Sequence, residues 1–204
     1  MWTSQSRTII LSLTFENCCN EEYIAEIKNI LGDSQYEIET SLINQYEYRG
    51  IKKVWHIAEK YPKSEILYFH SKGIVFRNES GIRTLHERIL FNNVIKQWKF
   101  VLQVLQTNPP INKVGLICSR RGSIWFNFWW ARASYILDLR EPILTTNRFY
   151  YERYLGKRFR GPITDKDCYN LYDNSIGLGL KSESANTLID DVILKITDDW
   201  MPHS

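Results

Sequence analysis

The 204-residue chain lacks several features that would place it in a broad class at once. Its net charge is only +3, from 26 Lys and Arg against 23 Asp and Glu, so the basic excess of a dedicated nucleic-acid binder is missing. It shows no internal repeat and no low-complexity tract. The apolar fraction of 44% and the scatter of both charge signs argue against long-range disorder. A chain of this length buries one ordinary core, and we expect a single domain over residues 1–204.

Long apolar runs and metal-ligand cysteine spacings are also missing. The first residues hold one Arg and a short, interrupted apolar run, which fits neither a signal peptide nor a membrane span. Cys18 and Cys19 are adjacent, Cys118 and Cys168 stand alone, and no histidine pair lies near the first two. We therefore expect a cytoplasmic protein with no membrane span, whose cysteines are reduced and mostly buried.

Aromatic residues are plentiful, at 14% of the chain, and many stand in clusters among predicted strands and helices. In the first part, apolar patterning predicts strands over 8–15, 36–44 and 66–69 and helices over 21–31 and 50–61. This β-α-β-α-β order favours an α/β fold with a mostly parallel central sheet flanked by helices.

In the rest of the chain, the predicted strands and helices alternate less regularly. It predicts helices over 84–106, 131–139, 145–155 and 185–197, and strands over 113–118 and 124–130.

The strand predicted over 66–69 is followed by His70-Ser71-Lys72-Gly73. In open parallel sheets, ligands bind at the carboxyl ends of strands, so this segment lies at the expected site. His70 and Lys72 are two residues apart and would project from the same edge, and Gly73 permits a sharp turn against a ligand. A surface turn with an incidental cation is the alternative.

Three segments together carry a resemblance to a known family: Tyr68–Gly73 (YFHSKG), Asn127–Arg132 (NFWWAR) and Tyr150–Glu152 (YYE). Over residues 8–156 the chain resembles GT-A-fold glycosyltransferases. It is most similar to a group of bacterial and large-virus glycosyltransferase-like sequences.

The resemblance implies a GT-A-like, Rossmann-like sheet with a nucleotide-binding half over about 8–75 and an acceptor half over about 76–204. It implies sugar transfer from a nucleotide-diphosphate sugar, a UDP-sugar before a GDP-sugar, to a glycan or to another hydroxyl acceptor linked to protein or lipid. This activity belongs to glycan biosynthesis, in the cytoplasm or, for a viral chain, the host cytoplasm.

The chain departs from the GT-A pattern where Asp-x-Asp would coordinate a divalent metal, because it has His70-Ser71-Lys72 there. Fixed cations can stabilise a leaving diphosphate as a metal does, so we expect a metal-independent or weakly metal-dependent site. Whether a divalent metal takes part stays open. A literal Asp-x-Asp occurs at Asp165-Lys166-Asp167, and we interpret it as a solvated loop, with a metal role as the minor alternative.

By analogy with the family, the end of the first strand, Thr14-Phe15, would hold the base and ribose of the nucleotide. Phe15 or Tyr48 could stack on the base, and Arg49 at the following helix start could meet a phosphate. For Phe15, ordinary core packing is the alternative.

The aromatic centre of the chain predicts a sugar-binding platform formed by Asn127, Trp129, Trp130 and Arg132. If the segment begins as a strand, alternation puts Asn127 between two Trp residues on one face, where indole rings stack on a pyranose and the amide bonds hydroxyls. Packing of all these residues in the core is the alternative.

Glu152 matches the acidic residue that inverting transferases of this fold present near the acceptor, although Arg153 stands where a second acid is common. Glu152 is thus the expected general base, with His70 and Lys72 stabilising the diphosphate. The alternative for Glu152 is an ion pair with Arg148 at helical spacing.

Two other function classes compete with the enzyme. A non-catalytic carbohydrate- or nucleotide-binding module of the same fold is the runner-up. An RNA-binding protein that uses Arg120-Arg121 is weak at this net charge, so we expect no nucleic-acid partner.

Overall fold

The computed structural model of the chain describes residues 11–16, 21–33, 36–41, 43–70, 87–157 and 166–177. These residues fall into two compact units. Unit 1 contains the described residues up to Lys53 together with Pro142–Tyr151, and unit 2 contains Val54–Glu141 and the described residues from Glu152 onward. Helix α2 (Tyr48–Lys60) begins in unit 1 and ends in unit 2.

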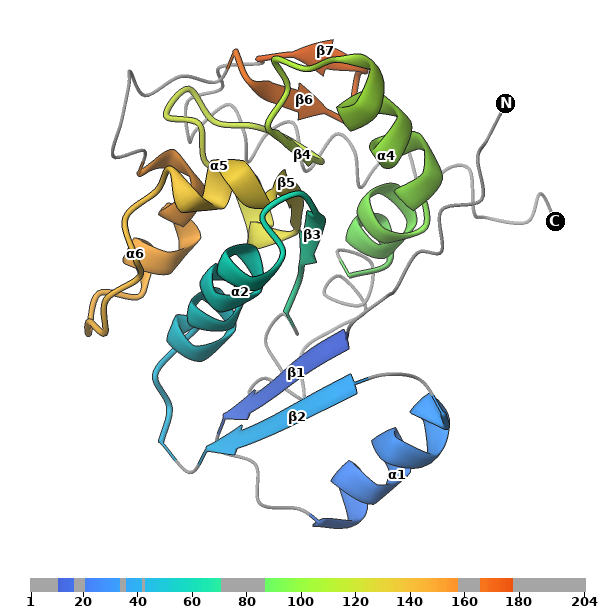
Figure 1. Cartoon of the computed structure of the whole chain (residues 1–204), viewed down its shortest axis with the longest axis vertical. Coiled ribbons are helices and arrows are strands. Elements are labelled where there is room, and N and C mark those ends of the chain that lie inside the picture. Colours follow the sequence, from blue (N-terminus) through green and yellow to red (C-terminus); the bar gives the residue numbers. More distant parts are fainter. Residues whose placement is uncertain are drawn as a thin grey trace, which may run out of the picture. The chain divides into compact units, whose positions relative to one another are not determined.

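Unit 1 contains a β-α-β segment (Figure 1). Strand β1 (Leu11–Glu16) pairs in parallel with β2 (Tyr36–Ser41), and α1 (Glu21–Leu31) connects them. Two glutamates in the first turn of α1 favour its start, and Gly32 ends it in the left-handed conformation at φ 52°. The helix predicted over 21–31 is confirmed.

Unit 2 is built on a five-stranded mixed sheet in the order β3-β5-β4-β6-β7. The strands are β3 (Glu65–Tyr68), β4 (Lys113–Gly115), β5 (Trp129–Arg132), β6 (Cys168–Asn170) and β7 (Ser175–Ile176). Only β4 and β6 pair in parallel, and the other neighbours are antiparallel. The described fold is thus mixed α/β, with a largely antiparallel sheet in unit 2 where the sequence predicted a mostly parallel one.

Strand β5 lies between β3 and β4 and is antiparallel to both, so β3, β4 and β6 run in one direction. Their carboxyl ends share one edge of the sheet, which we call the carboxyl edge. Register places Tyr68, Trp129, Gly115 and Asn170 in one row at this edge. In open parallel sheets, ligands bind at the carboxyl ends of strands, and β3, β4 and β6 are the strands of this sheet that share one direction.

The long helix predicted over 84–106 is interrupted. A π-helical turn, η1 (Phe91–Ile95), precedes α4 (Trp98–Thr107), and Gln97 between them leaves helical geometry at ψ 15°. Residues of α4 pack on β4 and the segment before it, through Val101, Val104, Leu105, Ile111 and Val114. This packing covers one face of the sheet.

The other short elements of unit 2 lie along the connections. They are η2 (Trp125–Asn127), α5 (Ala133–Leu137) and η3 (Tyr154–Gly156), while α6 (Phe149–Glu152) spans the unit boundary. The helix predicted over 145–155 is therefore shorter than expected, and the one predicted over 185–197 lies outside the described residues. None of the helices in the described ranges is long and apolar enough to cross a bilayer.

A disulfide joins Cys118, beyond β4, to Cys168 at the start of β6. Both residues are fully buried. The expectation of reduced thiols is wrong for this pair, because the parallel pairing of β4 with β6 brings together two cysteines 50 residues apart. Cys18 and Cys19 lie outside the described residues.

We expect the double variant Cys118→Ala/Cys168→Ala to lose about 4 kcal/mol in free energy of unfolding, since a crosslink that closes a loop of this length restricts the unfolded chain. Urea denaturation measures the loss, and wild-type protein in a dithiol reductant is the matched control. A peptide map without reduction should contain the two cysteine peptides joined. Recovery of both as separate free thiols would contradict the crosslink.

Candidate functional site

The end of β3 places an imidazole among aromatic rings at the carboxyl edge. Tyr68 stacks on Trp129 with ring centroids 5.1 Å apart, and the His70 ring lies 6.2 Å from Tyr68 and 5.7 Å from Phe128. Phe69 is 44% exposed and lies 6.0 Å from Phe128. His70 therefore reaches the edge that the sequence predicted, whereas Lys72 lies outside the described residues.

The segment before β5 does not have the strand alternation that the sequence predicted. Phe126 and Asn127 have φ 66° and 56°, two successive left-handed residues inside η2. This conformation is costly for residues with a side chain and has to be held by its surroundings. Trp129 donates its indole N–H to Asn127 Oδ1 at 2.7 Å, and both residues are buried.

The geometry gives Asn127 and Trp129 a role in the core. A fully buried indole offers no face to a sugar ring, and the Asn127 carbonyl is taken by Trp129. The platform expected from these two residues is therefore not formed in the structure, because the left-handed turn changes the side on which each residue lies.

Trp130 and Arg132 also make structural contacts. Trp130 donates its indole N–H to the Val94 carbonyl at 2.9 Å. Arg132 donates from Nε to the Ile111 carbonyl at 2.9 Å and from Nη2 to the Leu105 carbonyl near the end of α4. A guanidinium near the last turn of a helix satisfies carbonyls that the helix leaves without partners.

The residues predicted to hold the nucleotide lie in unit 1. Thr14 and Phe15 are in β1, opposite Glu39 and Thr40 of β2. Arg49 donates from Nη1 to Glu39 at 2.7 Å, so its guanidinium already has a carboxylate partner.

The remaining predicted site residues are Tyr48, the first residue of α2, and Glu152, the last residue of α6. The Tyr48 ring lies 6.3 Å from that of Tyr151 within unit 1. Glu152 ends α6, is half-buried, and belongs to unit 2.

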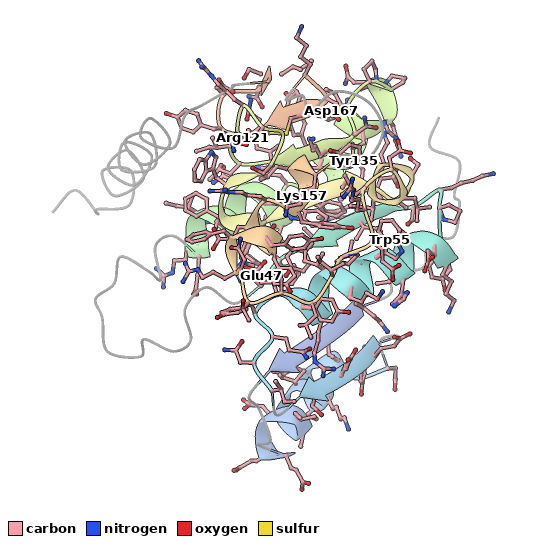
Figure 2. All side chains as sticks on the ribbon, turned by 90° about the vertical axis from the view of Figure 1, so that its left-hand side faces the viewer. Glu47, Trp55, Arg121, Tyr135, Lys157 and Asp167 are labelled. Atoms are coloured by element: carbon pink, nitrogen blue, oxygen red, sulfur yellow. A yellow bond between two sulfur atoms is a disulfide. The ribbon has the colours of Figure 1, made fainter. Side chains whose placement is uncertain are left out.

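Asp167 is buried, and the interpretation of Asp165-Lys166-Asp167 as a solvated loop is wrong for this residue. Lys113 Nζ lies 3.1 Å from Asp167 Oδ1 and donates to the Tyr135 hydroxyl at 2.7 Å, while Tyr135 donates to the Leu155 carbonyl at 2.6 Å. Figure 2 labels Tyr135 and Asp167 within unit 2. This buried network lies where β4 and β6 begin, opposite the carboxyl edge.

Comparison with protein-family models, with curated proteins and with solved structures gives no match.

A metal site does not fit the described residues of the carboxyl edge. His70 is surrounded by the rings of Tyr68 and Phe128, which offer no carboxylate or thiolate. No group of three or more His, Cys, Asp or Glu side chains able to hold a metal ion occurs in the described part of the chain. Divalent metals need several such ligands.

The sequence analysis did not predict that Arg153 and Lys157, on either side of η3, lie close enough for their charges to interact. Burial lowers the pKa of Lys157 from its ordinary value, and the positive charge of Arg153 lowers it further. The sequence carries a weak signal for this cluster, the i, i+4 spacing of the two residues on a helical turn.

We expect Asn127→Ala to lower the free energy of unfolding by about 2 kcal/mol, because the buried indole N–H of Trp129 loses its acceptor. Urea denaturation measures the change. Trp129→Phe in the Asn127→Ala background should then cost less than in the wild-type chain, by about 1 kcal/mol, since the two residues share one interaction. Strictly additive losses would show that the hydrogen bond contributes nothing.

We expect Asp167→Asn to cost about 3 kcal/mol, because it leaves the Lys113 ammonium buried without its counter-charge. Adding Lys113→Met should recover part of this loss, as removing both charges is less costly than removing one. Glu59→Gln, at an exposed pair with His56, is the matched control and should change stability by less than about 1 kcal/mol. Equal losses for Asp167→Asn and Glu59→Gln would contradict the buried pair.

Proposed function

We propose that the chain is a glycosyltransferase that moves a sugar from a nucleotide-diphosphate donor to a hydroxyl acceptor. The single observation that carries this proposal is the position of His70, at the carboxyl edge shared by three strands that run in one direction. The β-α-β segment of unit 1 supports a nucleotide-binding fold of the GT-A-like type, since parallel strands joined by a helix are its basic unit.

In the proposed reaction, the donor's bond between the sugar and the diphosphate breaks as the acceptor oxygen attacks the sugar carbon. His70, when protonated, would stabilise the charge that develops on the leaving diphosphate, and Lys72 would add a second cation. Arg49 would release the Glu39 carboxylate and bind a phosphate of the donor in its place. Glu152 would take the proton from the acceptor hydroxyl. UDP is the first nucleotide to test and GDP the second.

The runner-up is a non-catalytic nucleotide-binding module of the same fold. The observation that favours it is the burial of Trp129 together with the contact that occupies Asn127, since this removes the expected sugar platform. The two proposals differ in turnover and share nucleotide binding.

Calorimetry with UDP, GDP and TDP is the first test. We expect one nucleotide to bind selectively and His70→Ala to weaken its affinity at least about tenfold, the size expected for one lost charge-assisted contact. His56→Ala is the matched control, because His56 is an exposed histidine of α2 that pairs with Glu59. Binding should survive treatment with a chelator, and complete loss restored by manganese would overturn metal independence.

Turnover separates the enzyme from the module. We expect the sugar conjugate of the bound nucleotide to be hydrolysed or transferred, and Glu152→Gln with its fold intact to lower the rate at least about 100-fold. Circular dichroism verifies the fold. Near-normal rates in Glu152→Gln would remove that residue as the base, binding without turnover would favour the module, and absence of binding to all three nucleotides would reject both.

The Cys118–Cys168 disulfide bears on the cytoplasmic location that the sequence led us to expect. Structural disulfides are uncommon in the reducing cytosol, so the crosslink favours an oxidising compartment over the expected one.

A further inference from the structure

Helix α4 and the π-helical turn η1 before it have residues that face the core and residues that face solvent. Val101, Val104 and Leu105 of α4 are buried in a core cluster that includes Val114 of β4, so they hold the helix to the sheet (Figure 1). Val94 of η1 is fully buried in a second core cluster. The exposed residues of η1 and α4 therefore stand on a backbone that the core of unit 2 fixes.

Two large aromatic side chains of this segment are exposed. Phe91, the first residue of η1, has 46% of its surface exposed, and Trp98, the first residue of α4, has 40% exposed. Each ring has a lysine ammonium over it. Lys96 Nζ lies 5.6 Å from the centroid of the Phe91 ring, and Lys99 Nζ lies 5.5 Å from that of the Trp98 ring. We call Phe91, Lys96, Trp98 and Lys99 the lysine-aromatic surface.

Positive charge on this surface has no acidic neighbour along the chain. Residues 88–137 contain no Asp or Glu, and Glu87 and Asp138 are the acidic residues that bound this stretch. Within the described residues, Lys96 and Lys99 make ring contacts and neither pairs with a carboxylate. The two lysines are three positions apart, a spacing at which like charges on a helical segment repel each other. An anionic partner would offset this repulsion.

We propose that the lysine-aromatic surface binds the anionic surface of a lipid bilayer. Tryptophan and phenylalanine rings are favoured at the level of the headgroups, and the long lysine side chains reach lipid phosphates from the same depth. A helical segment with an aromatic and basic exposed surface is typical of one that lies on a membrane. This contact needs no helix that crosses the bilayer.

Two other anionic partners fit the surface less well. The outer surface of a single helix is convex and offers by itself no groove of the kind that peptides occupy, whereas a fluid lipid surface adapts to its shape. A nucleic acid needs a broader basic surface than a chain with a net charge of +3 provides. With two lysines and two rings, the binding to lipid is weak and reversible.

Co-sedimentation of the full chain with vesicles tests the proposal, using phosphatidylcholine alone and phosphatidylcholine mixed with phosphatidylserine in equal parts. We expect binding to the mixed vesicles that weakens as salt is added. Lys96→Gln/Lys99→Gln should lower the partition coefficient at least about tenfold, because each lysine near an anionic bilayer contributes about fivefold. Trp98→Ala should lower it at least about threefold, since less apolar surface enters the headgroup region.

Lys60→Gln/Lys63→Gln is the matched control for the lysine variant. It removes the same two charges at the same spacing, near the exposed Tyr61 ring, over which Lys60 Nζ lies at 5.3 Å from the centroid. Glu59 and Glu65 flank these residues in the sequence, so the positive charge there is offset. The control should bind the mixed vesicles as the wild type does, and so should Tyr61→Ala.

Several outcomes would overturn the proposal. These are no binding of the wild type to mixed vesicles, equal binding to vesicles with and without phosphatidylserine, or equal partition of the wild type and Lys96→Gln/Lys99→Gln. Binding of a polyglutamate peptide or an RNA oligonucleotide that depends on these lysines, without binding to vesicles, would also overturn it. If Trp98→Ala does not fold, the lysine variant decides, because both lysines are exposed.

The vesicle experiment is independent of the proposed function, because the lysine-aromatic surface does not include His70. His70→Ala should bind vesicles as the wild type does, and Lys96→Gln/Lys99→Gln should bind the selected nucleotide as the wild type does. Loss of nucleotide binding with vesicle binding intact therefore counts against the proposed function alone, and the reverse result counts against the lipid surface alone.

Discussion

The burial of the Trp129 indole is the constraint on which unit 2 depends. Trp129 has no exposed surface, stands in register between Tyr68 of β3 and Gly115 of β4, and stacks on the Tyr68 ring. A buried indole N–H requires an acceptor, and Asn127 supplies it two residues earlier. The chain provides that acceptor through a left-handed turn, and Phe128, which follows this turn, has its ring 5.7 Å from that of His70. The hydrogen bond between Trp129 and Asn127 thus lies in the segment that leads from the left-handed turn to the carboxyl edge.

The secondary-structure elements that were predicted correctly are those with a signal in the local sequence. Helix α1 followed from helical spacing and its terminal glycine, and β3 from a compact apolar run. The direction of β5 could not be predicted, because its apolar residues, Trp129–Ala131, carry no mark of the strands they pair with or of their orientation. The strand predicted over 124–130, with side chains on alternate faces, is wrong for a related reason. Two successive left-handed residues, Phe126 and Asn127, change the side on which every later residue lies.

The strand end that carries His70 was predictable from the sequence, whereas the contacts of other candidate residues were not. A strand end with a histidine is a local pattern, and His70 does reach the carboxyl edge. Arg132 was predicted to bind a sugar, but it donates to the Leu105 carbonyl near the end of α4. Asp167 was interpreted as part of a solvated loop, but it is the buried counter-charge of Lys113. Their partners are 27 and, for Lys113, 54 positions away, a separation that spacing rules do not reach.

The disulfide between Cys118 and Cys168 also determines what a break in the backbone would do. Every peptide bond between these residues lies inside a covalent ring, including those of the exposed stretch around Arg140 and Glu141. A protease that cuts there produces two chains that stay joined, so the molecule would migrate as one species until a reductant is added. The strands on both sides of the cut, β4 and β6, would remain tethered in their parallel pairing.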